Sequence, residues 1–215
     1  MAAERRWTFG VEPLPQALEV ASLLRSVAGL VLSLEAPHPA VERLAAALRG
    51  AEAELAKLAP ADLAPRLGSD PAATGRAYID HSRDIGAFNA CFPTYAIRVD
   101  GDRASGTVEF PIVFEGPPGL VNGGFLAVFF DLVVQHHNCD VGVAGKTTSI
   151  AVRYRRPTPL LTELAFEVER AVADGRITST ARLLAGGEVL CEAEVRAVAG
   201  NLAALPEVSP RRAGA

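Results

Sequence analysis

The chain has 215 residues, 49% of them hydrophobic, and a formal net charge of −4. A chain this apolar forms a sizeable core, which excludes global disorder. Its slight acidity argues against a nucleic-acid-binding protein, because such proteins carry a clustered basic excess. The three cysteines form no CxxC pair, so we expect a reduced, cytoplasmic protein. No run of about 18 uninterrupted apolar residues is present, and we expect neither a membrane span nor a secretory signal.

Residues 1–60 are predicted to form two helices that pack as a hairpin, either on the rest of the protein or on another copy. Pro37-His38-Pro39 separates the two helices, because proline cannot continue a helix. We assign residues 1–70 to this helical extension. Apolar residues recur every three or four positions in each helix: Val20, Leu24, Val27, Val31 and Leu34 in the first, and Val41, Leu44, Leu48, Leu55 and Leu58 in the second.

After an irregular region over residues 60–92, the hydrophobic period changes to two, which is typical of strands. Turn signals that contain glycine occur at 100–101, 174–175 and 186–187, where hairpins require them. We assign residues 71–205 to this domain and residues 206–215 to a flexible tail. The six predicted strand windows are 94–100, 103–114, 147–156, 162–172, 176–185 and 188–199.

Residues 116–135, between the second and third windows, are predicted to contain a buried helix. Asp131 is the only ionisable residue among them. A helix that is apolar on all sides must be buried on all sides. Because strands precede and follow it, we expect an antiparallel sheet to curve around it. The predicted fold class is therefore α+β, with the helix in the core.

Asp131 is a candidate site residue because a buried carboxylate costs several kcal/mol unless it is paired, hydrogen-bonded or neutralised. No lysine or arginine lies within two helical turns of it. Its isolation favours a functional carboxylate. The alternative is a structural aspartate that accepts hydrogen bonds from a neighbouring backbone or hydroxyl donor.

Asn122, Gly123 and Gly124 open the predicted helix. The first N–H groups of a helix have no partner within it, and the helix dipole favours negative charge there. Glycines allow a ligand to approach these groups, which makes them candidate oxyanion donors. Asparagine at the N-cap is, however, common without any such function.

The spacing of Gly123 and Asp131 indicates a dimer. Asp131 lies eight positions beyond Gly123, which corresponds to a rise of about 12 Å, and a side chain that leans toward the helix N-terminus recovers only a few ångströms of this. One helix therefore cannot place its own carboxylate beside its own glycine amide. A second, antiparallel copy of the helix can, so we expect a two-fold dimer with shared sites.

The run GPPGLVNGGFLAVFFD at residues 116–131, with YRRPTPL at 154–160, resembles the hotdog-fold acyl-CoA thioesterases over residues 85–199. The most similar branch is the phenylacetate-pathway and 4-hydroxybenzoyl-CoA thioesterase-like superfamily. This resemblance implies a hotdog fold, in which a curved antiparallel sheet wraps around a central helix. It also implies a homodimer or a dimer of dimers (homotetramer) with shared active sites.

The resemblance further implies residue roles. The Gly123 amide would polarise the thioester carbonyl, and Asp131 from the partner subunit would activate water or attack directly. Thr147, found by counting back from Pro157, would help to place the water. Gly124 and Asn89 would contribute to substrate binding, with Asn89 beside the acyl pocket. Neither a metal nor a cofactor is implied, apart from the coenzyme A of the substrate.

One position departs from the family, because the usual motif begins with His and this chain has Asn122. An amide can donate a hydrogen bond but cannot carry charge or shuttle a proton. Hydrolysis of an acyl-CoA is the leading hypothesis, since the water-activating carboxylate is retained. The alternatives are a non-catalytic acyl-thioester-binding protein and a hydratase of enoyl or hydroxyacyl thioesters, which generally needs a histidine at this site.

Two further groups of residues are candidates. His136, His137 and Cys139 lie in the predicted last helical turns, where histidines suit the helix dipole; His136 is alternatively a residue of the acyl or pantetheine channel. A zinc site would need a second ligand pair that is missing here.

The second group is arginine-rich. Arg153, Arg155 and Arg156 form a basic cluster in an acidic chain. They are either a solvated strand face or ligands of the coenzyme A phosphates, which arginine binds well.

Overall fold

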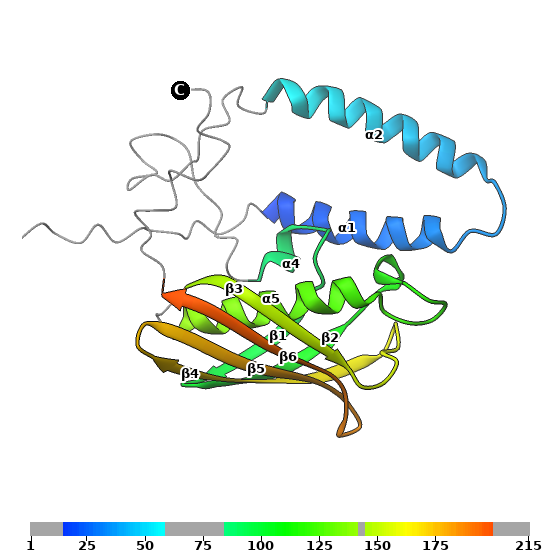
Figure 1. The fold of residues 1–215 in the computed structure, drawn as a ribbon. Coiled ribbons are helices and arrows are strands. Elements are labelled where there is room, and N and C mark those ends of the chain that lie inside the picture. Colours follow the sequence, from blue (N-terminus) through cyan, green and yellow to red (C-terminus); the bar gives the residue numbers. More distant parts are fainter. Residues whose placement is uncertain (1–14, 59–83, 142–144, 200–215) are drawn as a thin grey trace, which may run out of the picture. The chain divides into compact units, whose positions relative to one another are not determined.

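A computed structural model describes residues 15–58, 84–141 and 145–199 of the chain (Figure 1). The predicted boundaries at residues 70/71 and 205/206 lie outside the described residues and stay predictions. The described residues divide into two compact units. One contains residues 30–58, and the other contains residues 15–29 together with 84–199.

Both predicted N-terminal helices are present, as α1 (Pro15–Leu32) and α2 (Pro39–Leu58). Only Ala21 and Arg25 of α1 are buried, and α2 has no buried residue. The Arg25 guanidinium donates hydrogen bonds to the carbonyls of Gly86 and Asn89, which attaches α1 to the segment before the first strand. Packing of the two helices as a hairpin stays a prediction.

Helix α1 also modifies the expectation about membranes. By length and composition it is apolar enough to cross one, although core helices of soluble proteins and signal sequences meet the same criterion. Its apolar sequence is interrupted by Glu19 and Arg25, so α1 contains no uninterrupted apolar run of that length. The absence of a membrane partner therefore stays a prediction.

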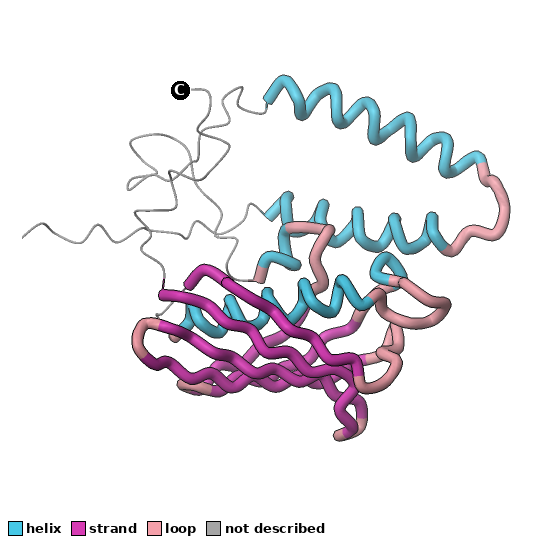
Figure 2. Tube along the Cα trace, viewed as in Figure 1, coloured by secondary structure: helices cyan, strands magenta, loops and turns pink. Residues whose placement is uncertain are grey.

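The six predicted strands form one antiparallel sheet in the order β1-β2-β4-β5-β6-β3, which curves around helix α5 (Figure 2). In β4 and β5 buried and exposed residues alternate, as a sheet with one covered face requires. The strands are β1 (Tyr95–Asp100), β2 (Arg103–Glu109), β3 (Gly145–Tyr154), β4 (Glu163–Ala173), β5 (Arg176–Ala185) and β6 (Glu188–Ala199). This is the predicted α+β class with a curved sheet.

The hairpin turns follow the predicted signals. Asp174 and Gly175 have positive φ, and so do Gly186 and Gly187. Positive φ at both central residues is the geometry of the two-residue turn that matches strand twist. The β2 prediction was too long at its end. Pro111 has no N–H for the ladder, and Ile112–Phe114 forms a 3-10 turn, η1, instead.

Between η1 and β3 lies the predicted core helix, α5 (Gly123–Asp140). Its aromatic residue Phe129 has no exposed surface and packs edge-to-face on Phe110 and Phe166, with ring centroids 5.4 and 5.3 Å apart. The short helix α4 (Ile85–Phe88) precedes β1.

The expectation that α5 is buried on all sides was wrong for the single chain. Ala127, Val128, Asp131 and Leu132 are only half-buried. The sheet of one chain covers one side of the helix, and the remaining apolar strip lies beside the edge strand β3, which is largely exposed. Helix α5 therefore has more apolar surface than the sheet of its own chain covers.

Candidate active site

The N-terminus of α5 presents an unpaired backbone donor. Asn122 is the N-cap, and its Oδ1 accepts a hydrogen bond from the Gly124 N–H at 2.8 Å. The Asn122 carbonyl accepts from Phe125 and Leu126. No described residue accepts a hydrogen bond from the Gly123 N–H. Of the two glycine amides predicted at the site, Gly123 is thus available to a ligand and Gly124 is used by the cap.

The side-chain amide of Asn122 is oriented by the same cap. Because its oxygen accepts from Gly124, its NH₂ group is directed away from the helix end and remains free to donate. Asn122 is exposed. Asn122, at the position where the resemblance implied a histidine, therefore caps the helix and keeps a side-chain amide that can donate.

Tyr154, the last residue of β3, is a neighbour of this donor that sequence reasoning did not select. Its hydroxyl donates a 2.8 Å hydrogen bond to the Gly123 carbonyl. A Cβ atom on Gly123 would lie 3.0 Å from the Tyr154 ring. The available signal was its position in the YRRPTPL run, on the same side of β3 as Ile150 and Val152.

Gly123 and Tyr154 line a cavity of about 410 Å³. Its walls are mostly apolar, with Leu120, Val121 and Leu126 on the helix side, and Arg155 and Arg156 also line it. A concave, largely apolar site with a few polar groups is typical of small-molecule pockets. The unpaired amide, the helix N-terminus and this cavity coincide.

Asp131 accepts a 2.8 Å hydrogen bond from the Thr147 hydroxyl. Two residues selected from the sequence are thus brought together by α5 and β3 of one chain. A β-bulge between Thr147 and Ser149 makes this contact possible. Without it, alternation along β3 would place Thr147 on the outer face with Ala151 and Arg153; the bulge turns its side chain toward α5.

The expectation that Asp131 is buried was wrong for the single chain, since it is half-buried. It belongs to the strip of α5 that the sheet leaves uncovered. Asp131 also lies more than two helical turns beyond Gly123, a rise of about 12 Å. Each chain therefore has an amide donor at the start of α5 and a carboxylate with its hydroxyl partner in the middle.

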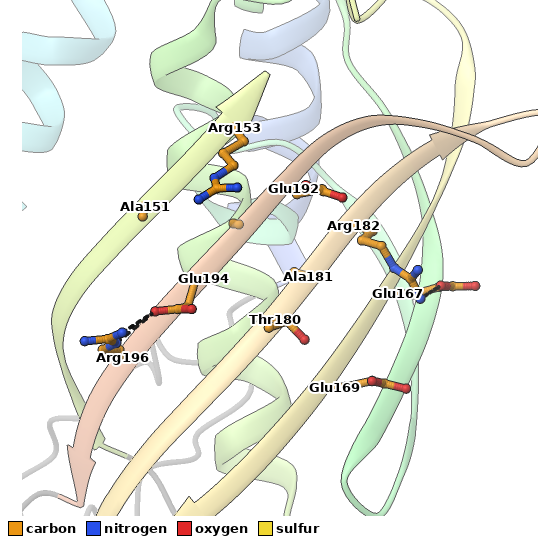
Figure 3. Close-up of a pocket in the computed structure, with 11 residues that line it drawn as sticks. Ala151, Arg153, Glu167, Glu169, Thr180, Ala181, Arg182, Glu192, Glu194 and Arg196 are labelled. Carbon is orange, nitrogen blue, oxygen red and sulfur yellow. Dashed lines mark hydrogen bonds and ion pairs between the residues drawn. The ribbon is translucent and has the colours of Figure 1, made fainter. Parts of the chain in front are cut away.

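The three predicted arginines do not form one cluster. Arg155 pairs with Glu192 at 2.8 Å, and Arg156 pairs with Glu188. Arg153 points to the opposite face of the sheet, where it lines a separate hollow of about 700 Å³ with Glu192 and Arg182 (Figure 3). Two of the three arginines thus line the Gly123 cavity, and Arg153 lines the outer hollow. Glu192, the strand partner of Arg153, also pairs with Arg155 and so lies between the two.

Asn89 and His136 lie in a different region. The Asn89 side chain accepts from the Cys91 N–H at 3.0 Å. His136 Nδ1 is 3.0 Å from the Tyr95 hydroxyl, and its Nε2 is 3.7 Å from the Asp140 carboxylate. Burial raises the pKa of the Tyr95 hydroxyl, and the nearby carboxylates raise it further.

His137 is fully buried, with Nε2 2.8 Å from the Gly101 carbonyl. Cys139 is half-buried and its sulfur accepts from Gln135. Over the described ranges no three His, Cys, Asp or Glu side chains converge as metal ligands would. His136, Cys139 and one ring nitrogen of His137 are therefore engaged with their own surroundings, while His137 Nδ1 and the Asn138 amide are buried without a hydrogen-bond partner among the described residues.

Comparison with solved structures supports the fold described above. No family model matches the chain, and no curated protein matches its sequence. Among solved structures, a thioesterase superfamily protein is similar with a TM-score of 0.71 and 27% identity, over 87% of this chain and 97% of its own. The matched 87% of this chain is longer than residues 95–199, which contain the sheet and α5, so the similarity extends beyond these elements.

Two other solved structures are similar over about half of this chain. A phenylacetic acid degradation-related protein from Ralstonia eutropha is 18% identical, with a TM-score of 0.44, over 48% of this chain and 83% of its own. A hypothetical thioesterase from Streptococcus pneumoniae, solved with coenzyme A, is 20% identical, with a TM-score of 0.46, over 50% of this chain and 90% of its own.

Proposed function

This chain shares the hotdog fold of the thioesterase superfamily, and from that premise we propose that it hydrolyses an acyl-CoA to the free acid and the thiol. The observation that carries the proposal is the Gly123 N–H, which has no partner among the described residues and opens on a cavity of about 410 Å³. An unpaired amide at a helix N-terminus is suited to stabilise an oxyanion.

In this mechanism the thioester carbonyl oxygen accepts hydrogen bonds from the Gly123 N–H and the Asn122 side-chain amide. Water attacks the carbonyl carbon while a carboxylate accepts its proton. Collapse of the tetrahedral intermediate breaks the C–S bond, and the departing sulfur takes the proton, so that acid and thiol are released. Removal of one oxyanion donor typically costs about 10²–10³ in rate.

The carboxylate is the partner's Asp131, because one α5 cannot bring its own Asp131 to its own Gly123. Two features support an antiparallel dimer. Edge strand β3 has unpaired backbone groups and the exposed apolar residue Ile150, and the uncovered strip of α5 lies next to it. Thr147 donates to Asp131 and is proposed to orient the attacking water with it.

Arg155 and Arg156 are proposed to bind coenzyme A phosphates at the cavity. Both are half-exposed and already paired with glutamates, so phosphate would compete with Glu192 and Glu188. Arg153 is left out of this proposal because it lies on the outer face of the sheet. We expect KM to rise with salt, because exposed charge interactions are screened.

The test is thiol release from acyl-CoAs of increasing chain length and from aromatic acyl-CoAs. We expect turnover of at least one class and its loss in Asp131→Asn. Turnover that survives unchanged in Asp131→Asn would overturn the assigned base.

Shared sites have a test of their own. Asp131→Asn and Gly123→Pro are each expected to be nearly inactive, since proline is tolerated at the first helical position but has no N–H to donate. Subunit exchange creates heterodimers in which one site has both native residues. A one-to-one mixture should recover up to about a quarter of the wild-type rate. No recovery despite proven exchange would contradict a site built from two chains. Ile150→Lys should lower the dimer affinity in sedimentation experiments.

A second candidate function is binding of an acyl thioester without hydrolysis, which Asn122 favours because an amide cannot transfer protons. Its oxygen is also occupied by the Gly124 N–H. Tight acyl-CoA binding without turnover at any pH would support this function, and a large gain of turnover in Asn122→His would show what is missing.

A further inference from the structure

The contact between Tyr154 and Gly123 has a consequence for the oxyanion donor. We infer that Tyr154 is a positioning residue, which fixes the first turn of α5 so that the Gly123 N–H stays directed into the cavity. This inference rests on the proposed hydrolysis. Its basis is the 2.8 Å hydrogen bond from the Tyr154 hydroxyl to the Gly123 carbonyl and the close approach of the ring.

The approach of the ring explains why residue 123 is a glycine. Gly123 does not have a positive φ, so its backbone conformation is open to other residues. The restriction is steric, since a Cβ would lie 3.0 Å from Cζ and from the hydroxyl oxygen of Tyr154. Gly124 is restricted by a different neighbour, because its Cβ would lie 3.2 Å from Asn122 Oδ1.

Tyr154 acts on the first turn of the helix, where Asn122 accepts from Gly124, Phe125 and Leu126 but the Gly123 N–H has no partner among the described residues. The first-turn N–H groups of a helix have no acceptors within it, so these residues fray easily. The Tyr154 hydroxyl ties this turn to the end of β3. The chain just after Tyr154 is itself fixed, since the N–H groups of Arg155 and Arg156 both donate to the Leu190 carbonyl.

The exposure of Tyr154 separates this role from a core-packing role. The residue is 57% exposed and lines the same cavity as Gly123. A ring with this exposure adds little burial of apolar surface compared with a core aromatic. The Tyr154 hydroxyl is held by the Gly123 carbonyl, and the residue also lines the cavity.

The first test removes only the hydroxyl. Tyr154→Phe should lower kcat about fivefold, the effect of one neutral hydrogen bond, while KM stays within about twofold and the melting temperature is nearly unchanged. A rise of KM alone, or a wild-type kcat, would overturn the inference.

The second test is a double-mutant cycle. Gly123→Ala should displace the Tyr154 ring and break its hydrogen bond, so combination with Tyr154→Ala should cost far less than the product of the two single effects. Gly124→Ala is the matched control, because its Cβ meets Asn122 instead. Its effect should multiply with that of Tyr154→Ala. If the effects of Gly123→Ala and Tyr154→Ala on kcat also multiply, the two residues are not coupled and the inference is wrong.

A third measurement needs no substrate and so separates failure of this inference from failure of the proposed function. The Phe125 and Leu126 N–H groups donate to the Asn122 carbonyl in the same turn. Their hydrogen exchange should become about fivefold faster in Tyr154→Phe. Unchanged exchange overturns the inference even in an active enzyme. Faster exchange in a protein that hydrolyses no acyl-CoA would support the ordering of this turn by Tyr154. It would contradict the proposed role of that turn in hydrolysis.

Discussion

The two ends of α5 differ in a way that composition does not reveal. The C-terminal end is rich in reactive side chains, yet His136 is hydrogen-bonded to Tyr95 and His137 is buried against the Gly101 carbonyl. The N-terminal end has only an asparagine and two glycines. There the Gly123 N–H has no partner among the described residues and faces a cavity.

This difference shows that a site is recognised by unpaired groups at an accessible surface rather than by a high density of reactive residues. A histidine whose nitrogen already has an acceptor or donor is occupied, and moving it costs the hydrogen bond. A backbone donor left open at a helix N-terminus breaks no hydrogen bond within the protein when it binds a ligand, and it needs no reorganisation during the reaction. Three predictions test this contrast between the two ends of α5, and a fourth checks the fold of the variants.

The largest effect is expected for Asp131→Asn. Loss of the general base should lower kcat by at least about a hundredfold, measured as thiol release from the best acyl-CoA. Asp140→Asn removes a carboxylate at the C-terminal end of the same helix and is the matched control. It should change kcat by less than about twofold. Equal losses of kcat in Asp131→Asn and Asp140→Asn would show that the two carboxylates of α5 do not differ in their role.

The next effect is expected for Thr147→Val, which removes the hydroxyl that donates to Asp131. Loss of a hydrogen bond to a charged group should lower kcat on the order of tenfold. Thr148→Val is the control, since the Thr148 hydroxyl donates to the Arg196 carbonyl at 3.1 Å. Thr147→Ser should retain most of the rate. A control variant as slow as Thr147→Val would point to distortion of the bulge instead.

A smaller effect of a different kind is expected at the C-terminal end. Tyr95→Phe removes the hydroxyl next to His136 and should lower the free energy of unfolding by about 1 kcal/mol, measured by urea denaturation. Its kcat should stay within about twofold of wild type. A strong loss of kcat at unchanged stability would move the reactive centre toward this end of α5.

The smallest effect concerns the cysteines and checks the fold of every variant. Burial raises the pKa of the Cys191 thiol to about 11, so at pH 8 only about a thousandth of it is thiolate. Cys91 is exposed. Iodoacetamide should therefore label Cys91 in the native protein and Cys191 only after unfolding, as mass spectrometry of peptides would show. Native labelling of Cys191 would mean that the sheet opens.

Much of the fold followed from local patterns. Alternating apolar residues predicted the strands, and glycine-containing pairs predicted the turns, because both depend on neighbours along the chain. The end of β2 was missed because Phe110 and Phe114 are apolar but belong to a turn after Pro111. The burial of Asp131 was misjudged because composition does not say how far one sheet reaches around a helix.

The sequence by itself determined the element order, the helix opened by Asn122 and the position of the one carboxylate in its apolar run. Those features depend on residue type and spacing alone. Only the tertiary structure decided that a bulge turns Thr147 toward Asp131 and that Tyr154 lies against Gly123. Each of these depends on which face of β3 meets α5, and a single extra residue in a strand reverses that choice.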